Sequence, residues 1–211
     1  GEAVLLAHAC GMPVVSIDYR VPPDHPFPAA ADDVLAVWSA LAVERDPATM
    51  AMGGTSAGAA LIMTTMLRCN TDGLPTPAAL FLGTPGADLT KTGDSMFINA
   101  EIDQFLGRYE GRASESIRLY AGDRDLSDPM LSPINGDLGA FPPTILITGT
   151  RDLLLSTPAR THRKLRYAGV PAELHVFEGM SHTTYLIAHQ SPEARDAFAE
   201  VAAFVDRHLR R

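Results

Sequence analysis

The sequence has 211 residues, of which 46% are hydrophobic and 20% are charged, and its formal net charge is −8. This composition is typical of a globular protein with a sizeable core. The negative charge, without any Lys/Arg-rich stretch, argues against nucleic acid and anionic membrane surfaces as partners. No apolar stretch is long enough to span a bilayer, and no signal-peptide pattern opens the chain.

The two cysteines, Cys10 and Cys69, provide neither a disulfide framework nor a metal site. Both lie in helical patterns, so we expect buried thiols. Together with the absence of a leader pattern, they favour a reducing compartment, and we expect a cytoplasmic protein. No motif for a metal or a cofactor is present, so none is expected.

Strand and helix patterns alternate along the chain, which predicts an α/β fold with a mostly parallel sheet and helices on both faces. One domain is expected over residues 1–211. Residues 84–140 are rich in Gly, Asp, Ser and Pro and are interpreted as an irregular insertion or connection, with one helical patch near 98–106. We expect helices at 2–10, 29–44, about 59–69, 157–168 and 192–209, and strands at 14–19, 48–53, 78–83, 144–149 and 172–177.

The stretch from Gly53 to Gly58 joins an apolar strand to a helix. Gly54, Ser56 and Gly58 match the G-x-S-x-G nucleophile elbow, in which a serine occupies a sharp strand-to-helix turn. A Cβ at either flanking glycine is expected to collide with the neighbouring strand or helix. The turn would place the N–H of Ala57 where it can stabilise charge on a substrate oxygen. An ordinary Gly-rich turn is the alternative, but the flanking strand and helix favour a nucleophile.

A nucleophilic serine needs a base, and the base needs an orienting acid. With this elbow the chain order is Ser, then Asp or Glu, then His. Asp152 follows the fourth predicted strand and His182 follows the fifth, so both are expected beside Ser56 at the carboxyl edge of the sheet. Asp88 follows an earlier strand and is the alternative acid.

The remaining candidates are less well placed. His175 lies inside a predicted strand, and the other histidines lie in helical patterns or precede the elbow: His8, His25, His162, His189 and His208. A polar loop holds three further aspartates, for which a turn role is the better interpretation: Asp123, Asp125 and Asp128.

Several stretches occur together in a recognisable order: residues 16–30 with D-Y-R and F-P-A, the elbow, Asp128-Pro129 with Ser132-Pro133, residues 142–152, and residues 169–182. In this respect the chain resembles the bacterial hormone-sensitive lipase family of carboxylesterases, in its GTSAG branch, over nearly its whole length. The resemblance implies an α/β-hydrolase fold, with the family triad on Ser56, Asp152 and His182.

The chain departs from that family at its beginning. It opens at Gly1 in what looks like the middle or end of a helix, so we expect the C-terminal portion of a longer protein. The family's first strands, its cap helices and its His-Gly-Gly-Gly loop are not seen. That loop supplies most of the oxyanion hole in relatives, so Ala57 would provide one donor and the loop the others.

The resemblance implies hydrolysis of short- to medium-chain acyl esters, or lactones, through an acyl-enzyme. Leu153, Met180 and Tyr185 lie near the triad in sequence and are candidates for lining a substrate pocket, although core packing is an equal alternative. Many relatives pair through their last strand and helix, which implies a homodimer through residues 172–210.

Two other functions remain open. The first is a truncated or degenerate hydrolase with little activity that serves as a folding or assembly fragment, through an uncovered strand near residues 14–19. An acyltransferase or peptidase would use the same triad, but nothing in the sequence favours an amine leaving group.

Overall fold

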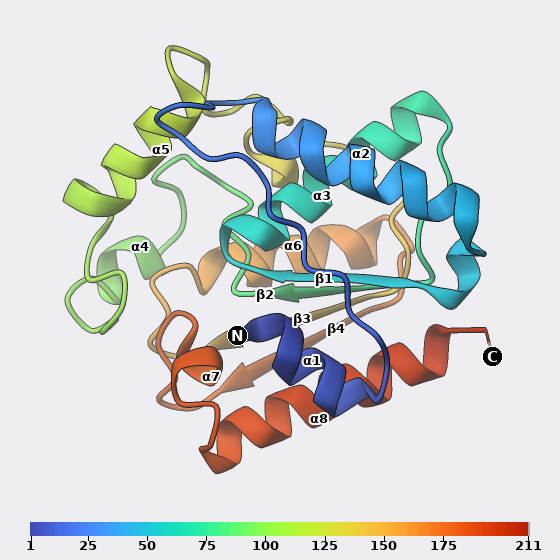
Figure 1. Cartoon of the computed structure of the whole chain (residues 1–211). Coiled ribbons are helices and arrows are strands. Elements are labelled where there is room, and N and C mark those ends of the chain that lie inside the picture. Colours follow the sequence, from blue (N-terminus) through green and yellow to red (C-terminus); the bar gives the residue numbers. More distant parts are fainter. Residues whose placement is uncertain (211) are drawn as a thin grey trace.

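A parallel four-stranded sheet forms the centre of the computed structural model, which describes residues 1–210 (Figure 1). Its strand order is β1-β2-β3-β4, and every neighbouring pair is parallel. The strands are β1 (Ala51–Thr55), β2 (Ala79–Gly83), β3 (Thr144–Gly149) and β4 (Ala172–Phe177). The predictions for β3 and β4 are confirmed. β1 begins later than predicted because Asp46 caps a short 3₁₀ turn, η1 (Pro47–Thr49), with its side chain.

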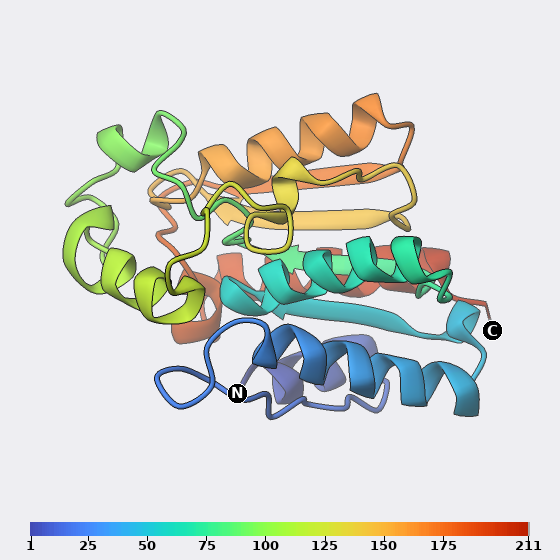
Figure 2. The same cartoon turned by 90° about the horizontal axis from the view of Figure 1, so that it is seen from above.

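Helices cover both faces of the sheet, as the alternating pattern predicts. Figures 1 and 2 show α2, α3 and α6 on one face and α1 and α8 on the other. Each of these helices corresponds to a predicted one, and α3 extends beyond its predicted end. Their bounds are α1 (Glu2–Cys10), α2 (Ala29–Glu44), α3 (Ala57–Asp72), α6 (Ser156–Tyr167) and α8 (Pro192–His208).

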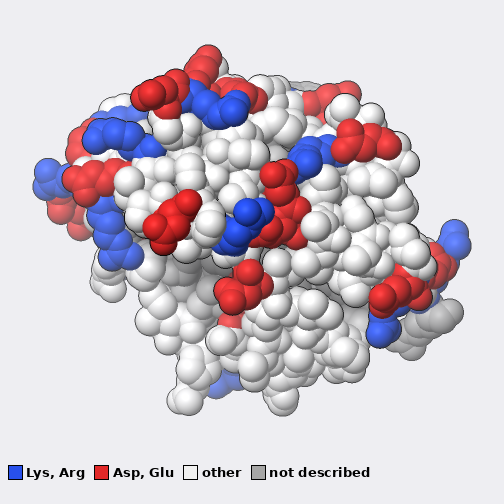
Figure 3. Space-filling model, turned by 45° about the horizontal axis from the view of Figure 1, so that its top comes forward, with Lys and Arg blue, Asp and Glu red and all other residues white. Residues whose placement is uncertain are grey.

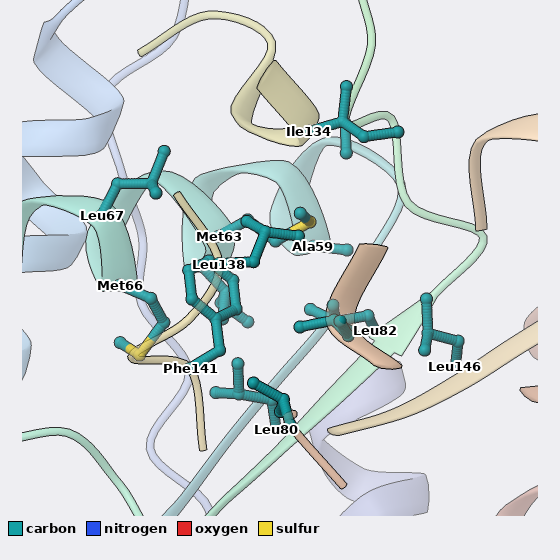
Figure 4. Packing of buried hydrophobic residues seen from close by; sticks show 14 of the residues in the cluster. Ala59, Met63, Met66, Leu67, Leu80, Leu82, Ile134, Leu138, Phe141 and Leu146 are labelled. Atoms are coloured by element: carbon teal, nitrogen blue, oxygen red, sulfur yellow. The ribbon is translucent and has the colours of Figure 1, made fainter. Parts of the chain in front are cut away.

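Alternate residues of the central strands supply two separate cores, because successive side chains of a strand point to opposite faces. Leu80, Leu82 and Leu146 pack with Met63 and Phe141 on the α3 side (Figure 4). Phe81, Ile145 and Ile147 belong to the cluster on the α8 side. All six of these strand residues are buried. The two cores hold the sheet, and therefore the loops at its carboxyl edge, in fixed positions.

The strand predicted at residues 14–19 does not form, and that prediction is wrong. These residues carry no strand pairing, and Val14 and Val15 are 41% and 63% exposed rather than buried. A β-branched run becomes a strand only when a neighbour supplies ladder hydrogen bonds. In the described residues β1 pairs only with β2, and no ladder hydrogen bond joins the run 14–19 to the free edge of β1 or to any other strand.

The region 84–140 contains more helix than predicted. It includes α4 (Ser95–Ile98), the kinked turn η2 (Tyr109–Ala113), α5 (Ser114–Ala121) and η3 (Pro133–Asn135). The helix predicted at 98–106 does not form, because α4 ends at Ile98, where the predicted helix would begin. The side chain of Asp103 accepts hydrogen bonds from the N–H groups of Phe105 and Leu106, which competes with helical bonding there.

One face of the protein carries charges of both signs. Figure 3 shows Lys and Arg interspersed with Asp and Glu over much of one face, and part of that face carries few charges. Within residues 1–210, no helix combines the length and apolar character needed to cross a bilayer. The same residues hold no cluster of three or more His, Cys, Asp or Glu side chains suited to a metal ion.

Candidate active site

Ser56 occupies a sharp turn between the end of β1 and the start of α3. Its backbone has φ 57° and ψ −115°, a conformation that side-chain-bearing residues rarely adopt. The turn is held from the end of β2: the Ser56 N–H donates to the Gly83 carbonyl at 2.8 Å, and the Gly86 N–H donates to the Ser56 carbonyl at 3.1 Å. These bonds support the strained conformation that the G-x-S-x-G pattern predicts.

The two glycines of the elbow have different roles. A Cβ at Gly54 would lie 2.9 Å from the backbone carbon of Gly58, closer than real Cβ contacts. A Cβ at Gly58 would meet nothing within 4 Å. The expectation that both glycines avoid a collision is therefore right for Gly54 and wrong for Gly58, because the residue at 58 already faces away on the first turn of α3.

Ser56, His182 and Asp152 form a hydrogen-bonded chain. His182 Nε2 lies 2.9 Å from Ser56 Oγ, and His182 Nδ1 lies 3.1 Å from Asp152 Oδ1. In the tautomer with its proton on Nδ1, the imidazole donates to the carboxylate and accepts from the serine hydroxyl. The side chains of His182 and Asp152 are 1% and 0% exposed. The structure thus brings together the three residues that the chain order singled out.

The acid is fixed by its own loop, which follows β3. The Thr148 hydroxyl donates to Asp152 Oδ2 at 2.8 Å, and the Leu154 N–H donates to Oδ1 at 2.9 Å. These donors, with His182, stabilise a carboxylate that is shielded from water. The bond from Thr148 also turns Oδ1 toward the imidazole.

The histidine loop follows β4 and packs directly on the end of β3. A Cβ at Gly149 would lie 2.0 Å from the Met180 carbonyl oxygen, so only glycine allows this approach. That carbonyl accepts from the Arg151 N–H at 3.1 Å. Backbone contact between the two loops therefore helps to set the distance between acid and base.

The N–H of Ala57 lies at the start of α3, where first-turn donors have no partner within the helix. The helix dipole adds partial positive charge at the same place. A serine oxygen activated by an imidazole, with an N–H donor beside it, is suited to attack a carbonyl and to stabilise the resulting oxyanion.

The alternative candidates are engaged elsewhere. Asp88 is buried, but its carboxylate pairs with Arg160 at 2.6 Å and accepts from Thr90. His175 contacts Glu173 on β4. In the polar loop, Asp125 and Asp128 accept hydrogen bonds from backbone N–H groups two residues on, as expected for turns.

The three residues expected near a substrate pocket are all buried. Leu153, Met180 and Tyr185 are 1%, 5% and 1% exposed. Met180 and Tyr185 belong to the core on the α8 side, and the Tyr185 hydroxyl lies 2.5 Å from Thr55 Oγ1. Burial raises the pKa of Tyr185 above its usual range. None of the three lines the cavity of about 610 Å³ beside β1, so their positions favour core packing.

Sequence reasoning missed a group of polar residues on the region 84–140. Ser95, Asn99 and Asp103 are all buried, and each bonds to the acid loop. Their spacing of four residues is the one available signal, because it would align them on one face of a helix. The structure places them along one side of α4 and the turns after it.

Comparison with known proteins points to one family. A sequence profile described as alpha/beta hydrolase fold matches residues 3–186. An esterase of Acinetobacter venetianus is 32% identical over 200 residues, which cover 94% of this chain and 66% of that protein. The carboxylesterase NlhH of Mycobacterium tuberculosis is 32% identical over 224 aligned residues, covering 99% of this chain and 68% of that protein.

Similar solved structures are also esterases. The crystal structure of one esterase superposes with a TM-score of 0.97 at 51% identity, covering 99% of this chain and 64% of that one. An esterase from the bacterial hormone-sensitive lipase family superposes with a TM-score of 0.92 at 32% identity, covering 98% and 69%. This chain therefore spans about two thirds of the length of the proteins it matches.

Proposed function

Since this chain belongs to the α/β-hydrolase fold family, and within it to the bacterial hormone-sensitive lipase group, we propose that it carries the catalytic triad of a carboxylesterase. The observation that supports this most strongly is the chain of contacts from Ser56 through His182 to Asp152, at 2.9 and 3.1 Å. The names of the relatives, esterase and carboxylesterase, favour a carboxylic ester as substrate.

In the first half of the proposed reaction, Ser56 Oγ attacks the ester carbonyl while His182 Nε2 takes the hydroxyl proton. Asp152 holds the imidazole in the required tautomer and stabilises the imidazolium. The N–H of Ala57 donates to the oxyanion of the tetrahedral intermediate. When the intermediate collapses, His182 gives its proton to the leaving alcohol, and the acyl group remains on Ser56.

In the second half, a water molecule replaces the alcohol. His182 takes a proton from the water, which attacks the acyl-enzyme, and then returns that proton to Ser56 Oγ as the carboxylic acid leaves. The preferred acyl group is short or medium in length, as the resemblance implies, and lactones belong to the same chemical class.

The rate of the isolated chain depends on its oxyanion donors. Loss of one such donor reduces kcat by about 10²–10³. Residues 1–211 correspond to about two thirds of the esterase relatives, so further donors can lie in segments that only the longer proteins share. We therefore propose that an N-terminally extended protein is more active than this chain.

Hydrolysis of p-nitrophenyl acetate and butyrate tests the proposal, with the chain and an extended version measured in parallel. Ser56→Ala is expected to abolish turnover in whichever form is active. Retention of full activity in Ser56→Ala would overturn the proposal. Ser56 can also be titrated with a fluorophosphonate, and mass spectrometry then shows whether the adduct is on that residue.

One observation favours a second candidate function, a hydrolase fragment that acts in assembly. In residues 1–210 the outer edge of β1 has no strand partner, and exposed strand edges promote pairing with other chains. A chain without esterase activity in either length, and without fluorophosphonate labelling, would support this candidate.

Two finer expectations remain proposals. The outer edge of β4 is also without a strand partner in residues 1–210, and Val176 on it is 45% exposed, which supports a homodimer through β4 and α8. Analytical ultracentrifugation tests this state. A cytoplasmic location is proposed from the two free cysteines and is tested by fractionation of cells that express the protein.

A further inference from the structure

Asp103 has a buried carboxylate that is bound by backbone N–H groups from three parts of the chain. Its exposed fraction is 2%. Oδ1 accepts from Phe105 at 2.8 Å and from Leu106 at 3.0 Å, which are local bonds. Oδ2 accepts from Leu153 at 2.7 Å and from His182 at 3.3 Å, which lie in the acid loop and the histidine loop.

A single oxygen atom thus joins the backbones of the two loops that carry the acid and the base. Leu153 directly follows Asp152, and the other N–H belongs to His182 itself. No Lys, Arg or His within residues 1–210 forms a salt bridge with Asp103. Its buried charge is stabilised instead by N–H donors, and such charge-assisted bonds are stronger than neutral ones.

Neighbouring residues of the same segment strengthen this link. Asn99 Nδ2 donates to the carbonyls of Thr150 and Asp152, at 3.1 and 2.8 Å. The Ser95 hydroxyl donates to the Leu153 carbonyl at 2.8 Å. Ser95, Asn99 and Asp103 therefore all hydrogen-bond to the acid loop. Among these three residues, only Asp103 also accepts a hydrogen bond from the His182 backbone.

We propose that Asp103 is a positioning residue, which sets the spacing between Asp152 and His182 by accepting the Leu153 and His182 N–H groups on one carboxylate oxygen. It touches neither the substrate nor the reacting atoms, and it acts through the two loops. The proposal rests on the proposed function of the triad. Misplacement of a catalytic group by about 1 Å can reduce a rate about 10²-fold.

Asp103→Asn separates positioning from folding because it changes one of the two oxygens. An asparagine oxygen can keep the local bonds to Phe105 and Leu106, since Asn forms the same turn as Asp. Its NH₂ group then faces the N–H groups of Leu153 and His182. Because an NH₂ group is also a donor, it cannot accept their hydrogen bonds. The loop 103–106 survives in this variant, while the link that Asp103 makes between the two loops is lost.

The test is carried out on the full 211-residue chain and has a spectroscopic and a kinetic part. The Nδ1 proton of a histidine bonded to a buried carboxylate gives a far-downfield NMR signal, assigned to His182 by its loss in Asp152→Asn. We expect Asp103→Asn to shift or broaden this signal. We expect kcat for p-nitrophenyl butyrate to fall about 10- to 100-fold, with KM within about twofold. If only an extended protein is active, the kinetics are measured on that protein.

Asp125→Asn is the matched control, because Asp125 also accepts a backbone N–H in a turn but is exposed and lies outside the site. An unchanged downfield signal in Asp103→Asn, with kcat within about twofold of the control, would overturn the proposal.

If Asp103→Asn does not fold, the same measurements are made on Asp103→Glu, which keeps the charge. Failure of both variants to fold would also overturn the proposal, because Asp103 would then be required for folding. If the wild-type chain shows the signal but never reacts with esters or fluorophosphonate, the proposed function fails while the signal still tests Asp103.

Discussion

Thr148 and Asp152 share a hydrogen bond that is shielded from solvent, in which the Thr148 hydroxyl donates to Oδ2 at 2.8 Å. Thr148 is on β3, so the sheet itself fixes the orientation of the carboxylate. The opposite oxygen, Oδ1, is then left facing His182. This hydroxyl is one of the connections between the core of the protein and the candidate site.

Thr148→Val is expected to destabilise the protein, because valine has the same shape but leaves a buried carboxylate oxygen without its donor. The expected loss is about 1–3 kcal/mol of the free energy of unfolding, measured by urea denaturation. Thr161→Val is the matched control. The Thr161 hydroxyl is also buried and has no hydrogen-bond partner, so its removal should leave the stability unchanged or raise it. Equal losses in both variants would contradict this explanation.

The elbow glycines should respond oppositely to alanine. Gly54→Ala forces a Cβ to within 2.9 Å of the Gly58 backbone, and such overpacking destabilises by about 1–3 kcal/mol. Gly58→Ala meets open space within a helix, where alanine is favoured over glycine by about 0.5–1 kcal/mol. Thermal unfolding of the two variants compares them directly. A destabilised Gly58→Ala together with a normal Gly54→Ala would show that the elbow packs differently.

The identity of the acid is tested by replacing each buried candidate with its amide. Asp152→Asn is expected to reduce kcat by about 10⁴, because the imidazole would be held in the wrong tautomer. Asp88→Asn weakens the contact with Arg160 and is expected to lower stability while kcat per folded molecule stays the same. Activity is measured at a temperature where both variants are folded. Reversed effects on kcat would make Asp88 the acid.

The ion pair between Asp33 and Arg20 should give a pH-dependent contribution to stability. Hydrogen bonds from Arg20 lower the pKa of Asp33 from 3.8 to about 2. The folded protein therefore binds this proton more weakly than the unfolded chain, so the contribution is complete above about pH 4 and disappears as the pH falls toward 2. Asp33→Asn should be less stable than wild type at neutral pH and converge with it in acid. Asp24→Asn, at an exposed position, is the control in the same unfolding experiment.

The sequence predicted those parts of the fold in which local pattern and tertiary contacts agree. β3 and β4 have the predicted bounds because their apolar runs are bounded by turn residues and paired with neighbours. The order of Ser56, Asp152 and His182 identified the residues that meet in the structure, since the carboxyl ends of parallel strands share one edge. Their catalytic roles remain predictions.

Other features depend on contacts that no local pattern contains. Residues 14–19 have the composition of a strand but form no strand pairing within the described chain. Asp103 lies in a segment with helical periodicity, and its bonds to Leu153 and His182 join residues about 50 and 79 positions away. Such long-range bonds depend on how the loops are arranged in space, and this arrangement cannot be predicted from the spacing of residues in the sequence.

The separation of 126 positions between Ser56 and His182 has a consequence for the order of folding events. Ser56, Asp152 and His182 follow three strands that must first align in parallel, a pairing that closes long loops and is therefore slow. Secondary structure can form before any of these distances is correct. In a refolding experiment, Ser56 should consequently become reactive only after most of the far-ultraviolet circular dichroism signal has recovered. The rate at which it gains reactivity toward a fluorophosphonate would then report the last steps of folding.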